Sequence, residues 1–231
     1  MKKKSIFRVS GILILVFAMV FVMASCGEKG PAAYVDKEIG NIISSKNCEK
    51  EVQDVLEDVL EEEMNISDDN EKDFKKYYDN NIKKSGIQKS LVDILTSAKY
   101  EVSDEKVSGD KATVKVTVKT KNYGDAFTKA GLKGLDKLVA ELAEKNLSEE
   151  AIEDDDFYSM VFKFYGNALK KSVRNAEDGY ESSVTLHLKK DDGEWELENE
   201  DKGQEALDLF NVLTGGMVDG IQNMEDAINR M

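Results

Sequence analysis

The sequence predicts an α+β fold in which a bent four-stranded antiparallel sheet, made of two hairpins, packs against several helices. Two stretches alternate between apolar and polar residues around a turn signal, which is the pattern of hairpins with one buried face. The segments around them repeat apolar residues every three or four positions, as amphipathic helices do. Two hairpins alone would expose their apolar faces, so helices must cover that face of the sheet.

Residues 1–25 have the three parts of a secretory signal peptide. Four basic residues lie within the first eight positions, Ile12 to Met23 is an unbroken apolar run, and Ala24-Ser25 supplies small residues at the cleavage point. Met23-Ala24-Ser25-Cys26 resembles the lipobox of bacterial lipoproteins. The resemblance implies cleavage before Cys26, lipidation of Cys26 with a diacylglycerol, and palmitate labelling. Two acyl chains are enough for stable anchoring at the extracytoplasmic face of the cell membrane.

Two other interpretations of this leader stay open. The uncharged span of residues 9–27 is close to the length that an uncleaved membrane-spanning helix needs. Alternatively, the leader is an ordinary signal peptide and Cys26 is incidental. All three interpretations export the remainder of the chain. We expect residues 26–33 to form a lipidated tether and residues 34–231 a single α+β domain.

The N-terminal part of that domain, residues 34–66, is predicted to be helical. A helix pattern covers Tyr34 to Glu63, with a break expected near Ser44-Ser45 or Asn47. Ser67 is a good N-cap for a second helix that runs to about Ser97, with a break at Ser85-Gly86 as an alternative.

The two hairpins follow at separate places in the chain. Lys99–Val107 and Lys111–Lys121 flank the turn Ser108-Gly109-Asp110, and valines alternate along the return strand. "YESSVTLHLKKDDGEWELEN", which starts at Tyr180, alternates more clearly and turns at Asp191-Asp192-Gly193. One face of each hairpin is therefore apolar and the other polar.

Two helices separate the hairpins and another element closes the chain. Asp125 is expected to cap the first of the two, and Ser148 to open the second. The last element, 204–231, carries a three-four apolar stripe, with a kink expected near Gly215. We expect this element to cover its own sheet; the alternative is that it pairs with another chain. The inward stripe of the second helix comprises Phe157, Val161, Phe162, Tyr165, Leu169 and Val173.

The "DDGEWELEN" strand, a helix before a hairpin and the lipobox leader together resemble one group of proteins. These are small uncharacterised lipoproteins of Gram-positive bacteria with nuclear-transport-factor-2-like or cystatin-like domains. The resemblance covers roughly Lys72 to Asn199 and implies a cone-shaped fold with a pocket between sheet and helix. No functional residue is carried over, because no motif position matches one.

The charge of the exported part limits its partners. The leader holds four of the 32 basic residues and none of the 46 acidic ones, so the remaining 206 residues carry a net charge of −18. Such a surface repels phosphate backbones and anionic lipid headgroups, which argues against nucleic-acid binding and flat membrane docking. Arg174 and Arg230 are the only arginines after the leader, which argues weakly against an anionic small ligand.

Motifs of catalysis and of metal binding are missing from the sequence. His187 is the only histidine, and no nucleophile elbow, phosphate-binding glycine loop or dinucleotide fingerprint occurs. The acidic runs Ser67 to Asp73 and Glu153 to Asp156 lack EF-hand spacing, and both lie near helix starts. We therefore expect no cofactor and no metal. Cys48 falls on an apolar stripe and is expected to be a buried side chain rather than a reactive thiol.

These observations favour a lipid-anchored, non-catalytic module of the cell envelope that binds a small ligand or a protein. One alternative is a hydrolase or isomerase with a sheet-lined pocket in which His187 acts as general base. Another is an envelope structural or assembly protein. If a pocket exists between the second hairpin and the 148–174 helix, its candidate lining residues are His187, Thr185, Tyr165 and Phe162. Aromatic side chains in that helix are otherwise expected to pack in the core.

Overall fold

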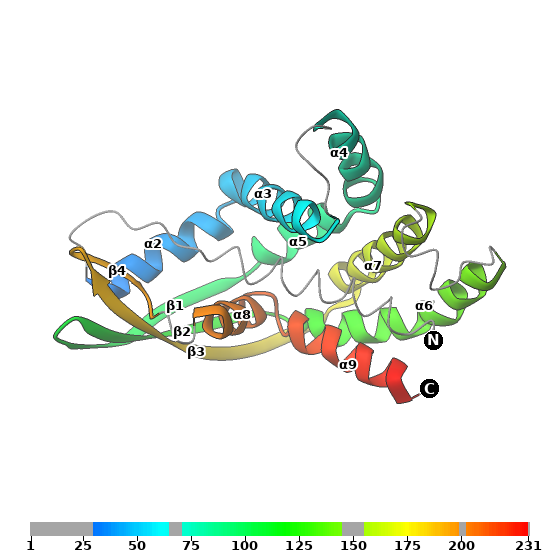
Figure 1. Ribbon diagram of the computed structural model, residues 1–231. Helices are drawn as coiled ribbons and strands as arrows, with labels where there is room; N and C mark the ends of the chain where they lie inside the picture. The colour runs from blue at the N-terminus through cyan, green and yellow to red at the C-terminus, as the bar shows by residue number, and fades with distance from the viewer. Residues whose placement is uncertain (1–29, 65–70, 145–154, 199–201, 231) are drawn as a thin grey trace.

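The computed structural model describes residues 30–64, 71–144, 155–198 and 202–230 (Figure 1). The leader, Cys26 and the predicted caps Ser67 and Ser148 lie outside these residues. The elements, in chain order, are α2 (Pro31–Ile43), α3 (Ser45–Met64), α4 (Glu71–Tyr78), a π-helical segment (Asp79–Lys83), α5 (Ile87–Leu95), β1 (Lys99–Ser108), β2 (Lys111–Lys121), α6 (Tyr123–Glu144), α7 (Asp155–Asn175), β3 (Asp178–Asp191), β4 (Glu194–Leu197), α8 (Lys202–Leu213) and α9 (Met217–Arg230).

The four strands form one antiparallel sheet in the order β1-β2-β3-β4. The predicted α+β class and the two hairpins are confirmed, with strand limits within one residue of the expected limits for the first hairpin. β2 and β3 are neighbours in the sheet although α6 and α7 separate them in the chain. The helical pair α6–α7 is therefore an insertion between two paired strands.

One face of the sheet is covered and the other is open. On the covered face Val114, Val116 and Leu186 are fully buried, as the alternation predicts. On the open face Thr113 pairs with His187, and Lys115 and Thr117 follow on the same side of β2. Helices α2 and α8 contact the strands, α2 at β1 and β2 and α8 at β3 and β2.

The remaining helices pack mainly on one another. Figure 1 shows α6, α7 and α9 together, at the end of the molecule away from the hairpin turns. α6 contacts both α7 and α9, and α5 lies between α3 and α7. The C-terminal segment thus packs on its own chain, but only its first half, α8, covers the sheet; α9 packs on α6.

The predicted helix breaks occur where the backbone requires them. α2 and α3 are separated at Ser44, and the last element is divided by Gly215 and Gly216, whose φ angles of +62° and +79° suit only glycine well. Two starts differ from expectation. α2 begins at Pro31, three residues earlier than predicted, because proline suits the first helical turn. The cap of α6 is Asn122, whose Oδ1 accepts the backbone N–H of Asp125, so Asp125 lies inside the first turn.

Candidate functional site

A groove runs between α6 and α7 among the described residues. It consists of two adjoining cavities of about 450 Å³ and 320 Å³ that share Ala130 and Lys171 in their linings. We call it the α6–α7 groove. Its lining residues are Asn122, Asp125, Ala126, Lys129, Ala130, Lys133, Gly134, Lys137, Leu138 and Glu141 on the α6 side, and Met160, Lys163, Phe164, Asn167, Ala168, Lys171, Asn175 and Glu177 on the α7 side.

Small side chains form the floor of this groove. Ala126, Ala130 and Gly134 recur every four residues on α6, so they lie along one face of the helix. Ala168 faces them from α7, and the Phe164 ring lies against Gly134. Larger side chains at these positions would fill the space between the helices, so the hollow is a direct result of this sequence pattern.

Lysines line both edges of the groove. On α6, Lys129, Lys133 and Lys137 are spaced by four residues, so the three side chains lie on one face along about 12 Å of helix. On α7, Lys163 and Lys171 are separated by Asn167 at the same spacing. All five lysines are exposed.

The groove differs in charge from the chain as a whole. Its lining contains five lysines and three carboxylates, whereas the whole chain has a net charge of −14. Lys137 pairs with Glu141 at 3.5 Å. Within the described part of the chain, no ion pair is formed by Lys129, Lys133, Lys163 or Lys171. The five lysines and three carboxylates give the lining a net charge of +2, on a chain whose net charge is negative.

The four residues predicted to line a sheet–helix pocket are not brought together. Phe162 and Tyr165 are 1% and 0% exposed, and the Tyr165 ring stacks on Phe127 at 6.2 Å between centroids. Thr185 and His187 lie on the open face of the sheet, opposite to the face that the helices cover. Neither of the two cavities is lined by any of the four.

His187 has a partner that the sequence pattern did not indicate. Glu205 of α8 accepts the backbone N–H of His187 at 2.9 Å, and its other oxygen lies 2.5 Å from Nδ1 of the imidazole. A carboxylate oxygen accepts hydrogen bonds, so Nδ1 of His187 is the donor in this contact. The one available signal was the position of Glu205, four residues before the buried Leu209, because that spacing puts a carboxylate on an apolar helix face.

The His187–Glu205 pair joins α8 to the sheet beyond the end of β4. The backbone N–H of Glu198 is bonded to the carbonyl of His187, and the N–H of His187 would have no strand partner without Glu205. The imidazole is on the surface, with 53% of the His187 side chain exposed. We therefore interpret the pair as a structural contact between helix and strand.

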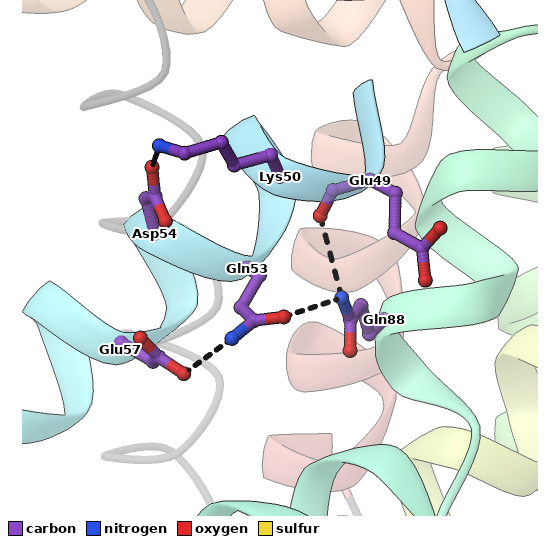
Figure 2. Close-up of polar contacts among 6 residues, drawn as sticks. All are labelled: Glu49, Lys50, Gln53, Asp54, Glu57 and Gln88. Atoms are coloured by element: carbon purple, nitrogen blue, oxygen red, sulfur yellow. Dashed lines mark hydrogen bonds and ion pairs between the residues drawn. The ribbon is translucent and has the colours of Figure 1, made fainter. Parts of the chain in front are cut away.

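Polar contacts on α3 have a similar structural role (Figure 2). The side-chain amide of Gln88, on α5, donates to the carbonyl oxygen of Glu49 at 3.3 Å and lies 3.5 Å from Oε1 of Gln53. Gln53 in turn donates to Glu57. Gln88 is only 5% exposed, so these bonds satisfy a buried amide where the two helices meet.

Cys48 and possible metal-binding groups are the remaining candidates for chemistry. Cys48 is fully buried, which confirms the structural interpretation, and burial raises the pKa of its thiol to about 11. Among the described residues, no group of three or more histidine, cysteine or carboxylate side chains could hold a metal ion. The side chains of the acidic runs Ser67 to Asp73 and Glu153 to Asp156 lie outside that part of the chain.

No described helix combines the length and the apolar character needed to cross a membrane. Comparisons of the chain with models of protein families, with curated proteins and with solved structures found no match.

Proposed function

We propose that the chain is a lipid-anchored lipoprotein of the extracytoplasmic membrane face, and that its folded part is a non-catalytic binding module. The observation that carries the binding function is the α6–α7 groove, with an apolar floor and five lysines at its edges. A concave surface that combines a small apolar floor with a few charged groups is typical of ligand sites.

The proposed anchor is Cys26, at the end of the leader. The lipobox residues Met23-Ala24-Ser25-Cys26 support it. α2 begins at Pro31, five residues after Cys26, and five extended residues span at most about 18 Å. A diacylglycerol on Cys26 would therefore hold the module close to the membrane surface.

We extend the proposal to the finer fold assignment, a nuclear-transport-factor-2-like or cystatin-like domain. A four-stranded antiparallel sheet with helices on one face supports it. The implied pocket between sheet and helix has no counterpart in the two described cavities, which lie between α6 and α7. An experimental structure, superposed on members of both fold groups, tests this assignment.

Palmitate labelling of the full-length protein in the producing bacterium tests the anchor. We expect the wild type to be labelled and to sediment with membranes, whereas Cys26→Ser is unlabelled. Cys48→Ser is a matched control, because it removes the other cysteine of the chain and should keep the label. Equal labelling of the wild type and Cys26→Ser, or recovery of the wild type in the cytosol, would contradict the anchor.

Native mass spectrometry tests the binding function. The full-length protein is purified from membranes in detergent and mixed with a small-molecule extract of the cell envelope. We expect an adduct on the wild type that is lost in the double variant Lys133→Glu/Lys171→Glu, which reverses one charge on each edge of the groove. No adduct, or the same adduct on both proteins, would remove the support for the groove as the binding site.

A further inference from the structure

We propose that the α6–α7 groove binds a small molecule that carries two or three phosphate groups within about 12 Å, the helix length along which Lys129, Lys133 and Lys137 lie. This inference rests on the proposed function, because it names the ligand class of the same groove. It rests on three features of the groove: the net positive charge of its lining, the chemistry of its lysines and the limited length of its basic strip.

The first step is the charge pattern of α6. Several lysines on other helices pair with a carboxylate four residues away, as in Lys50–Asp54, Lys83–Asp79 and Lys89–Asp93. Carboxylates occur at this spacing only at the two ends of the α6 row, where Asp125 precedes Lys129 and Glu141 follows Lys137. On α6 the neighbours of Lys133 at that spacing are Lys129 and Lys137, and like charges at this spacing destabilise a helix. The lysines of α7 add to the same positive field from the other edge. An anion bound between the edges would relieve this repulsion.

The second step is the kind of cation. The groove contains lysines and no arginine. Arginine's planar fork matches carboxylate and phosphate alike, so its absence does not separate the two, and the lysines count against the argument from its scarcity elsewhere in the chain. Lysine binds phosphate as a point charge, and a phosphate group carries about −1.5 to −2 with three strong acceptor oxygens, more charge than a carboxylate. Asn167 and Asn175 add amide donors, and the alanine floor can contact an apolar body. The lining therefore favours phosphate groups on a small organic or polyol skeleton over a polycarboxylate.

The third step is the length of the strip. Asp125 and Glu177 line one end of the groove and Glu141 lies at the other, so the basic strip is closed by carboxylates on both sides. A long polyanion would extend past these carboxylates over a chain whose net charge is −14. A small multivalent anion stays within the strip. The overall acidity thus selects against nucleic acids and long polymers without excluding a short phosphorylated ligand.

Calorimetric titration of the full-length protein in detergent tests the ligand class. The probes are tripolyphosphate, citrate, orthophosphate and long-chain polyphosphate. We expect tripolyphosphate to bind more tightly than citrate or orthophosphate, and its affinity to fall as salt rises. Lys133→Glu/Lys171→Glu should weaken it by about tenfold or more, since each exposed charge contact contributes up to a few-fold.

Two control variants isolate the groove. Lys76→Glu reverses an exposed lysine of α4, outside the groove, and should leave the affinity for tripolyphosphate within about twofold. Lys133→Arg keeps the charge and should retain most of the binding. Urea unfolding of each variant shows whether it is folded before its affinity is compared.

The outcomes separate this inference from the proposed function. If the groove-dependent adduct from the envelope extract forms but tripolyphosphate does not bind, the phosphate class is wrong and the binding function stands. If citrate binds as tightly as tripolyphosphate, the preference for phosphate is wrong. If long-chain polyphosphate binds more tightly per chain than tripolyphosphate, the length limit is wrong. If neither adduct nor probe binds the wild type, both proposals fail.

Discussion

Glu205 is a buried carboxylate whose contribution to stability can be measured. It is 8% exposed and accepts two hydrogen bonds from His187, one from the backbone and one from the ring. Glu205→Ala would leave the His187 N–H without its partner, which typically costs about 1–3 kcal/mol. We expect Glu205→Ala to lower the free energy of unfolding by about 2 kcal/mol in a urea titration.

Two variants show whether this loss comes from the backbone contact. His187→Ala removes the ring but keeps the backbone N–H donating to Glu205, so it should destabilise the protein less than Glu205→Ala does. Glu198→Gln changes a half-buried carboxylate that pairs with the exposed Lys111, and it should change the urea midpoint little. If Glu205→Ala unfolds at the same urea concentration as the wild type, Glu205 does not hold α8 to the sheet.

Single residues were predictable where local spacing decides their position. Cys48, Phe162 and Tyr165 lie on apolar helix stripes, and all three are buried. Residues whose role depends on distant elements were not predictable. His187 meets Glu205 only because β4 ends early enough for α8 to reach the edge of β3. The sequence around Lys133 predicts only a solvated helix face. Its place in a groove follows from the position of α7 beside α6, which no local pattern indicates.

At the scale of elements, the contact of α6 with α9 depends on a close approach at Gly220. Its carbonyl accepts the hydroxyl of Thr128, and a Cβ at this position would lie 2.5 Å from the carbonyl oxygen of Gly124. Because that atom belongs to the backbone, the helices themselves would have to separate. We expect Gly220→Ala to lower the free energy of unfolding by about 1–3 kcal/mol, the range for overpacked sites.

A second glycine provides the matched control for Gly220→Ala. Gly203 lies in the first turn of α8, and no atom of the described residues comes within 4 Å of a Cβ placed there. Gly203→Ala should therefore stabilise the protein slightly, because alanine is the better helix former by up to about 1 kcal/mol. Thermal unfolding of both variants checks the sign. A rise in Tm for Gly220→Ala would show that α9 is not packed against α6 as described.

Element boundaries were largely predictable from the sequence, but the packing partners of the helices were not. The alternation around Val114 and Val116 predicted the strands, and the glycines near Gly215 predicted the break in the last element. The partner of α9 depends on small residues that lie far apart in the sequence, such as Gly124 on α6 and Gly220 on α9, which are 96 positions apart. Such a match has no local periodicity, so neither the α6–α9 contact nor the α6–α7 groove could be predicted.

At the scale of the whole molecule, buried acids predict that the protein loses stability at alkaline pH. Burial raises the pKa of the Cys48 thiol from 9.0 to about 11, and it also raises the pKa of the Tyr34 and Tyr78 hydroxyls well above 10.0. These groups therefore keep their protons in the folded state at a pH where the unfolded chain releases them. The folded state then binds more protons than the unfolded state, so the free energy of unfolding falls as pH rises.

The loss should begin near pH 9, where the Cys48 thiol of the unfolded chain ionises, and should steepen above pH 10 as the tyrosines follow. Each group fully ionised only in the unfolded state contributes about 1.4 kcal/mol per pH unit. Tyr78→Phe is the sharpest variant, because the buried Tyr78 hydroxyl has no hydrogen-bond partner among the described residues. Its stability at pH 7 should match or exceed that of the wild type, and its decline between pH 10 and 11 should be shallower. Urea titrations at half-unit intervals measure both slopes, and equal slopes for the two proteins would mean that Tyr78 ionises as readily in the folded state as in the unfolded one.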